Sequence, residues 1–178
     1  LISRRSGRPV QHEKVSLLDI FEMMLGILTE PAEQVQVMHR QATLQREHLQ
    51  DIEGTIDTYR RILGLSPEDG DAVVALEGLY RGEERWDELT DVYALHLSAV
   101  EDTEYQASVR TMMAEVFAEN LEDPRGAVNA LTPILETLPA HVETLSTLAR
   151  LYSELEDWTA CVDVLSREAD VLADDAER

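Results

Sequence analysis

The chain has 178 residues, of which 44% are apolar, and it contains only eight Gly and six Pro. This composition, rich in Leu, Ala, Glu and Arg, predicts a folded all-α protein and excludes a chain that is disordered throughout. Its formal charge of −21, from 36 acidic against 15 basic residues, opposes binding to nucleic acid or to an anionic membrane surface, and no basic patch interrupts it.

Membrane insertion is not predicted either. The best apolar run, residues 15–28, is interrupted by two acidic residues and a glycine, so it falls short of the ~18 apolar residues of a membrane span. The lone cysteine, Cys161, allows no intramolecular disulfide and fits a reducing compartment, so a cytoplasmic location is predicted. Residues 1–5 contain neither an initiating Met nor an apolar signal core, which suggests a fragment of a longer protein.

Helix start signals and the spacing of apolar residues predict nine helices. At Ser66-Pro67 a hydroxyl acceptor precedes a proline whose missing N–H is harmless in a first turn, and Asp123-Pro124 repeats this device. Residues 1–12 are polar and basic and are predicted to form a linker. In chain order, the predicted helices cover residues 13–30, 32–48, 51–64, 68–82, 85–101, 104–120, 124–137, 140–155 and 158–173.

An internal repeat organises these helices. Residues 51–93 align with residues 123–165 at a constant offset of 72 without a gap, and twelve of the 43 pairs are identical. Four equivalent positions follow one another along the chain at steps of 34, 38 and 34: Ile52, Trp86, Pro124 and Trp158. The basic period is therefore 34, with a four-residue insertion in alternate repeats. Self-similarity at a fixed period predicts a stack of similar helix pairs.

A period of 34 is that of the tetratricopeptide repeat, and segment 72–93 resembles that family's pattern. Leu76, Tyr80 and Tyr93 fall on its first-helix Leu and Tyr and on its second-helix aromatic residue. The resemblance implies a right-handed superhelical solenoid of antiparallel helix pairs over residues 13–178, in which helix 13–30 has no preceding partner. Four repeats are expected to follow it, at residues 36–69, 70–107, 108–141 and 142–175.

The resemblance also implies a concave groove, lined by the first helix of each pair. The inward residues are expected to be Arg40, Leu44, His48, Val74, Gly78, Arg81, Met112, Val116, Asn120, Ser146, Arg150 and Glu154. Met and Val would provide an adaptable apolar strip, and the three arginines could bind a carboxylate with paired donors. The family's clamp for a C-terminal carboxylate, made by Lys and Asn, is not transferred, because its positions hold Met112, Val116 and Val74.

The sequence contains no recognisable catalytic set. It has no Gly-rich phosphate loop, no HExxH and no Glu three residues before a His, so neither an enzyme activity nor a metal site nor a cofactor is predicted. Cys161 is interpreted as a small packing residue. Trp86 and Trp158, which recur in register, are expected to pack against adjacent helices.

The predicted function is a protein–protein interaction scaffold that binds a partner peptide or helix in the concave groove. The alternative is a structural spacer or self-association segment of a larger repeat array. Self-association would use helix 13–30, because its apolar face has no preceding helix to cover it.

Overall fold

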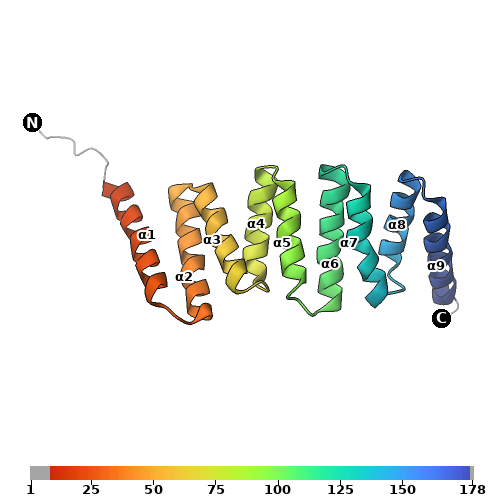
Figure 1. Ribbon diagram of the computed structural model, residues 1–178, viewed down its shortest axis with the longest axis horizontal. Helices are drawn as coiled ribbons and strands as arrows, with labels where there is room; N and C mark the ends of the chain where they lie inside the picture. The colour runs from red at the N-terminus through yellow and green to blue at the C-terminus, as the bar shows by residue number, and fades with distance from the viewer. Residues whose placement is uncertain (1–8, 177–178) are drawn as a thin grey trace, which may run out of the picture. The chain divides into compact units, whose positions relative to one another are not determined.

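The structure, a computed structural model, describes residues 9–176 and the side chains of residues 17–173. In this range every regular element is a helix (Figure 1). The chain divides into two compact units, of which unit 1 ends at Glu83 and unit 2 begins at Glu84. The boundary between the units lies inside the predicted second repeat, 70–107, and the repeat boundaries expected over residues 13–178 remain a prediction.

In unit 1 the described residues form four α-helices and one π-helical turn that continues the second of them. Their bounds are α1 (Pro9–Ile27), α2 (Pro31–Leu44), η1 (Gln45–Leu49), α3 (Ile52–Leu65) and α4 (Gly70–Gly82). Each helix packs against the next one along the chain. The first helix begins at Pro9, four residues before the predicted start, because proline suits the first position of a helix. The end of the predicted linker 1–12 is therefore helical, and residues 1–8 lie outside the described part.

In unit 2 the same pairwise packing continues through five α-helices and a second π-helical turn. Their bounds are α5 (Trp86–Leu97), α6 (Thr103–Glu115), η2 (Val116–Asn120), α7 (Pro124–Thr137), α8 (Val142–Glu154) and α9 (Trp158–Ala176). Again each helix packs against its neighbour in the chain, from α5 on α6 to α8 on α9.

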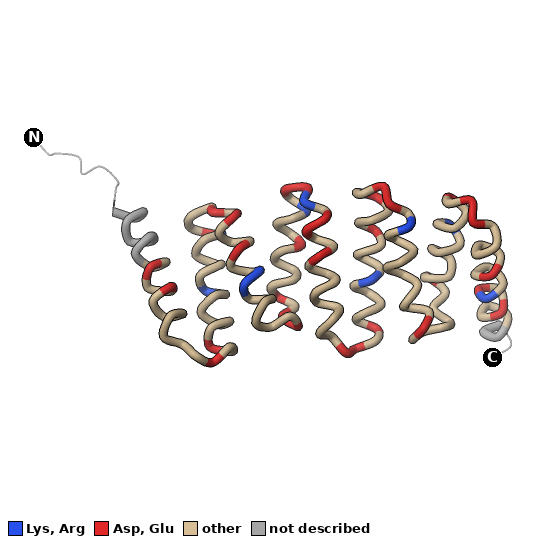
Figure 2. The backbone as a smooth tube through the Cα atoms, viewed as in Figure 1, with Lys and Arg blue, Asp and Glu red and all other residues tan. Residues whose placement is uncertain are grey.

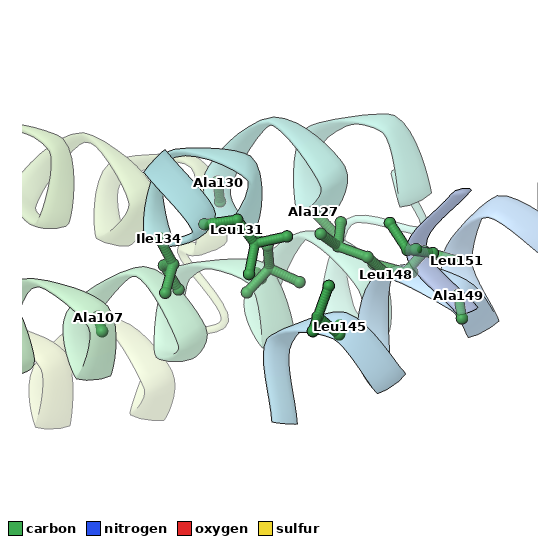
Figure 3. Close-up of a cluster of buried hydrophobic side chains, with 12 residues drawn as sticks. Ala107, Ala127, Ala130, Leu131, Ile134, Leu145, Leu148, Ala149 and Leu151 are labelled. Atoms are coloured by element: carbon green, nitrogen blue, oxygen red, sulfur yellow. The ribbon is translucent and has the colours of Figure 1, made fainter. Parts of the chain in front are cut away.

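The core of unit 2 combines small and large apolar side chains from four consecutive helices, α6 to α9 (Figure 3). Its buried members are Ala107, Ala114, Ala127, Ala130, Leu131, Ile134, Leu135, Leu145, Leu148, Ala149, Leu151 and Val164. The alanines allow close approach of the helix backbones, and the leucines fill the space between them. The apolar stripes of α6 to α9 thus form one continuous cluster.

Aspartate side chains cap several of the helices. Asp69 accepts a hydrogen bond from the Ala72 N–H at 2.8 Å, and Asp102 accepts one from the Tyr105 N–H at 2.7 Å. The predicted cap Ser66 does not serve α4, because Ser66 and Pro67 lie in a turn that precedes the helix. A carboxylate next to the first free N–H groups also interacts favourably with the helix dipole.

The turns inside the helix pairs share one unusual backbone conformation. Among the residues that the structure describes, four other than glycine have positive φ: Gln50 (55°), Glu84 (55°), Glu122 (52°) and Glu156 (58°). Their steps along the chain, 34, 38 and 34, are those of the sequence repeat, and each stands two residues before the second helix of its pair. An L side chain in this left-handed region costs about 1–2 kcal/mol, so the turn geometry is maintained against a local penalty.

Glu156→Gly is therefore expected to raise the free energy of unfolding by up to about 1 kcal/mol, because glycine adopts a positive φ without a steric penalty. Urea unfolding followed by tryptophan fluorescence measures the change. As a control, Asp163→Gly in the exposed interior of α9 should lower stability by about 0.5 kcal/mol. A loss of stability in both variants would contradict the prediction.

The four-residue insertion lies mainly in the first helix of alternate pairs. The continuous helices α2–η1 and α6–η2 cover residues 31–49 and 103–120, whereas α4 and α8 have 13 residues each. The additional turn of each long helix contains the π-helical segment, which accommodates extra residues without interrupting the helix. The alternation between shorter and longer repeats is thus chiefly an alternation of helix length.

A polar network connects α1, α2 and α3 in unit 1. Gln41 Nε2 donates a hydrogen bond to Glu22 Oε1 at 2.8 Å, and Arg61 Nη1 donates to the same oxygen at 3.1 Å. A second hydrogen bond, from Thr58 Oγ1 to Gln45 Oε1 at 2.7 Å, is buried beside it. The hydrogen bonds from Gln41 and then Arg61 lower the pKa of Glu22. These side chains thus connect the three helices through polar contacts.

Candidate partner-binding surfaces

Two of the residues predicted to line the concave groove are not available to a partner. Leu44 is 8% exposed and Val116 is fully buried, because both belong to the apolar faces of their helices that form the core. The residues immediately before them, Thr43 and Glu115, are exposed instead. One residue corresponds to a rotation of about 100° around a helix, which is enough to exchange a core position for a surface position.

The other predicted groove residues reach the surface. Met112 is half-buried, and the rest are exposed: Arg40, His48, Val74, Gly78, Arg81, Asn120, Ser146, Arg150 and Glu154. Two of the three arginines already have acidic partners one helical turn away. Arg81 Nε lies 3.0 Å from Glu77 Oε1, and Arg150 Nη1 lies 2.6 Å from Glu154 Oε1. Such exposed pairs are weak, about 0.3–0.5 kcal/mol, but they leave less positive charge for a partner's carboxylate.

A small cavity of about 170 Å³ lies between the first helices of two successive pairs in unit 2, and we name it the α6–α8 cleft. Its lining residues are Thr111, Ala114, Glu115, Ala118, Glu119, Leu131, Glu143, Thr147, Arg150 and Leu151. Ala114, Leu131 and Leu151 are buried and form an apolar floor. Of the predicted groove residues, only Arg150 lines this cleft.

The rim of the α6–α8 cleft is acidic. Three exposed carboxylates surround it: Glu115 and Glu119 of the continuous helix α6–η2 and Glu143 of α8. The lining contains one basic residue, Arg150, which is paired with Glu154. Acidic positions also outnumber basic ones within each unit (Figure 2). Clustered carboxylates raise the local concentration of cations, so the cleft favours a positively charged side chain. The chemistry of this surface is the reverse of the predicted carboxylate binding.

A larger cavity of about 580 Å³ lies on another side of α6, between the second helices α5 and α7, and we name it the α5–α7 groove. Its lining residues are Ala94, Leu97, Ser98, Arg110, Met113, Phe117, Asp123, Gly126, Asn129 and Ala130. None of these residues is among the predicted groove residues, which all belong to the concave side that the family resemblance implies. Comparing the residues that differ between the two copies of the double repeat could have revealed the α5–α7 groove.

The last helix presents an apolar stripe to solvent. Four of its apolar side chains are exposed: Trp158 (62%), Val162 (63%), Leu165 (46%) and Leu172 (53%). The expectation that Trp158 packs against an adjacent helix is wrong, because no described helix follows α9 to cover this face. Trp86 is half-buried. Cys161 is buried, and its Sγ lies 3.4 Å from the Ala149 carbonyl oxygen, as expected for a packing residue.

Two further findings concern only the described residues. No group of three or more His, Cys, Asp or Glu side chains among them could hold a metal ion. In the same range, no helix has both the length and the apolar character needed to cross a membrane.

These helix pairs define an all-α fold of the tetratricopeptide-like class, which confirms the fold class predicted from the repeat. A crystal structure of MamA aligns with 100% of this chain and 99% of its own at a TM-score of 0.54 and 10% identity. A second crystal structure of MamA aligns with 80% of this chain and 75% of its own at a TM-score of 0.51 and 13% identity. The structure MamA MSR-1 C2 aligns with 95% of this chain and 94% of its own at a TM-score of 0.50 and 13% identity.

Neither a protein-family model nor the sequence of a curated protein matches the chain. At identities of 10–13%, the similarity to MamA concerns the fold alone.

Proposed function

We propose that the chain is a protein-interaction scaffold that holds a basic segment of a partner protein in the α6–α8 cleft. The observation that supports this proposal is the acidic rim above an apolar floor. A lysine or arginine of the partner could lay its methylene groups on Ala114 and Leu151 and direct its charge to the rim carboxylates. Thr111 and Thr147 add hydroxyl groups that can bind the partner's backbone.

The spacing of the carboxylates favours such a partner. Glu115 and Glu119 stand four residues apart on the continuous helix α6–η2, and both line the cleft. Glu143 faces the same cleft from α8. A single cationic side chain entering the cleft is therefore attracted by carboxylates from two helices. Because these groups are exposed, the attraction should weaken as the salt concentration rises.

Neutralising the rim is expected to weaken binding of a basic peptide. The probe is a fluorescein-labelled peptide of alternating Lys and Ala, and fluorescence anisotropy at low salt gives its Kd. The triple variant Glu115→Gln, Glu119→Gln, Glu143→Gln should raise Kd about tenfold, since each exposed pair contributes about 0.2–1 kcal/mol. A control with the same change in net charge neutralises three exposed residues outside the cleft: Glu101→Gln, Glu122→Gln and Glu156→Gln. Equal losses in both triple variants would mean that only overall charge attracts the peptide, and would reject the cleft.

The apolar stripe of α9 favours a second candidate function, in which the chain associates with itself or spans a longer array. In unit 2 the residue of α7 that aligns with Leu165 at an offset of 34, Leu131, is only 1% exposed, whereas Leu165 is 46% exposed. Self-association through helix 13–30 remains a prediction, and Leu17 and Ile20 of α1 are 43% and 47% exposed.

If α9 mediates self-association, the molar mass measured by light scattering should rise with protein concentration, and the fluorescence of Trp158 should shift to shorter wavelength. Val162→Asp with Leu165→Asp should then leave a monomer at every concentration. Val74→Asp, at an isolated site that is 68% exposed, serves as the control. A wild-type chain that stays monomeric throughout would exclude this candidate.

A further inference from the structure

The α5–α7 groove lies at the place that corresponds to the polar network between α1, α2 and α3 in unit 1. The offset of 72 that relates the repeats also relates the two sites. It aligns Glu22, Gln41, Gln45, Thr58 and Arg61 of unit 1 with Ala94, Met113, Phe117, Ala130 and Pro133 of unit 2. All five residues that form the network are thus replaced by residues whose side chains form no hydrogen bonds of this kind.

The replacement removes from unit 2 the bridge that connects three helices in unit 1. In unit 1, Glu22 of α1 reaches Gln41 of α2 and Arg61 of α3, so one carboxylate connects three helices. The corresponding residue of α5 is Ala94, which is too short to reach α6 or α7. The bridge formed by Glu22 therefore has no counterpart at this position of α5, and a cavity of about 580 Å³ lies between α5 and α7. This volume lies in the range of about 300–1,000 Å³ that is typical of ligand sites.

The shape of the groove suits a helix. Its floor consists of large side chains from the continuous helix α6–η2, namely Arg110, Met113 and Phe117. Its two flanks carry mostly small residues, such as Ala94 of α5 and Gly126 of α7. Small flanking residues allow another backbone to approach closely, and a long apolar floor receives the side chains of an amphipathic helix. Methionine in such a floor adapts to different side chains.

Arg110 determines the charge that such a helix should carry. Its side chain is half-buried at the groove and forms no hydrogen bond or ion pair with any described residue. A partly buried guanidinium without an anion is favourable for a carboxylate, which it can bind with two parallel hydrogen bonds. Asp123, the other charged residue of the lining, already accepts a hydrogen bond from the Arg125 N–H at 3.1 Å as the cap of α7.

From this arrangement we infer that the α5–α7 groove binds an acidic amphipathic helix of a partner protein. The apolar side chains of that helix pack on Met113 and Phe117, and a carboxylate beside them binds Arg110. Arg110, Met113 and Phe117 follow one another at helical spacing on one side of α6, and Glu115 and Glu119 of the α6–α8 cleft occupy another side. The inference is therefore independent of the proposed basic partner, and the two surfaces select segments of opposite charge.

The test uses a synthetic Ala-based helix with Leu and Phe one turn apart on one face. A Glu stands one turn beyond each of them, so that either direction of docking brings a carboxylate to Arg110. Titration into the full ¹⁵N-labelled chain, followed by NMR, should shift the amide signals of the groove lining. The Glu peptide should bind at least about tenfold more tightly than a peptide with Gln at both positions, because a hydrogen bond to a charged group contributes about 1.5–3 kcal/mol.

Three variants connect this preference to the groove. Arg110→Met keeps an apolar stem and should bind the Glu and Gln peptides equally, whereas Arg110→Glu should reverse the preference in favour of a Lys peptide. Ala94→Phe fills the groove from an exposed position and should weaken the binding of all three peptides at least tenfold. An unchanged circular dichroism spectrum checks that this variant is folded. Arg125→Met, at an exposed arginine of α7 outside the lining, should change nothing. The inference is overturned if Arg110→Met still prefers Glu, if Ala94→Phe binds like the wild type, or if the shifted amides lie on α9 or in the α6–α8 cleft.

Discussion

Leu148→Ala is expected to lower the free energy of unfolding of unit 2 by about 2–5 kcal/mol. Leu148 is 1% exposed in the cluster formed by α6 to α9. The substitution removes its transfer free energy and leaves a cavity that neighbouring helices can fill only in part, because each is fixed by its own contacts. Since the whole stability of a domain is about 5–15 kcal/mol, this is a large fraction of it.

The two tryptophans make the measurement specific. Trp86 and Trp158 are the only tryptophans of the chain and both lie in unit 2, so fluorescence during urea unfolding reports on this unit. The exposed neighbour Val162 of α9 provides the control, and Val162→Ala should change stability by no more than about 0.5 kcal/mol. A loss below about 1 kcal/mol for Leu148→Ala would show that this core position collapses around the smaller side chain.

Gly126→Ala is expected to lower the stability of unit 2 by about 1–3 kcal/mol, although Gly→Ala inside a helix normally raises it by about 1 kcal/mol. A Cβ atom at Gly126 would lie 2.6 Å from Phe117 Cδ1 and 2.5 Å from Asp123 Oδ2. The first contact displaces an aromatic ring of the groove floor, and the second disturbs the cap of α7. Thermal unfolding with fluorescence detection gives the change.

A matched glycine tests the direction of this effect. Gly78 of α4 has nothing beyond its own helix backbone within 4 Å of the place of an added Cβ, so Gly78→Ala should raise the stability of unit 1, followed by circular dichroism, by about 0.5–1 kcal/mol. Phe117→Ala should cost less in the Gly126→Ala background than in the wild type, because the clash with the ring is then absent. An increase in stability for Gly126→Ala alone would contradict the steric argument.

The helix pairs and their spacing could be predicted because two independent signals agree. The positions that the repeat marks as equivalent, Ile52, Trp86, Pro124 and Trp158, are the first residues of α3, α5, α7 and α9. Apolar periodicity located the helices, and the constant offset between the two double repeats fixed their correspondence. The shared turn conformation before each of these starts explains why the correspondence is so regular.

The binding surfaces could be predicted only in part, because they depend on which side of each helix faces outward. Family analogy placed Leu44 and Val116 in the groove, yet packing against neighbouring helices buries both. The reverse happened at Trp158, whose apolar ring suggested a core position, although no described helix covers it. The α5–α7 groove arises from substitutions of polar by apolar residues, and a hydrophobicity pattern cannot distinguish such a cavity from a filled core.

The alternation of long and short first helices limits how the chain could be enlarged or shortened by design. Insertion of a single short repeat beside α7 and α8 would place two short first helices in succession. A long first helix would then no longer alternate with a short one along the chain. A module of two successive repeats, cut at equivalent turns such as Gln50 and Glu122, keeps the order of long and short intact. The smallest interchangeable building block of this protein is therefore a double repeat, and chimeras joined at these turns should fold more readily than those joined one repeat apart.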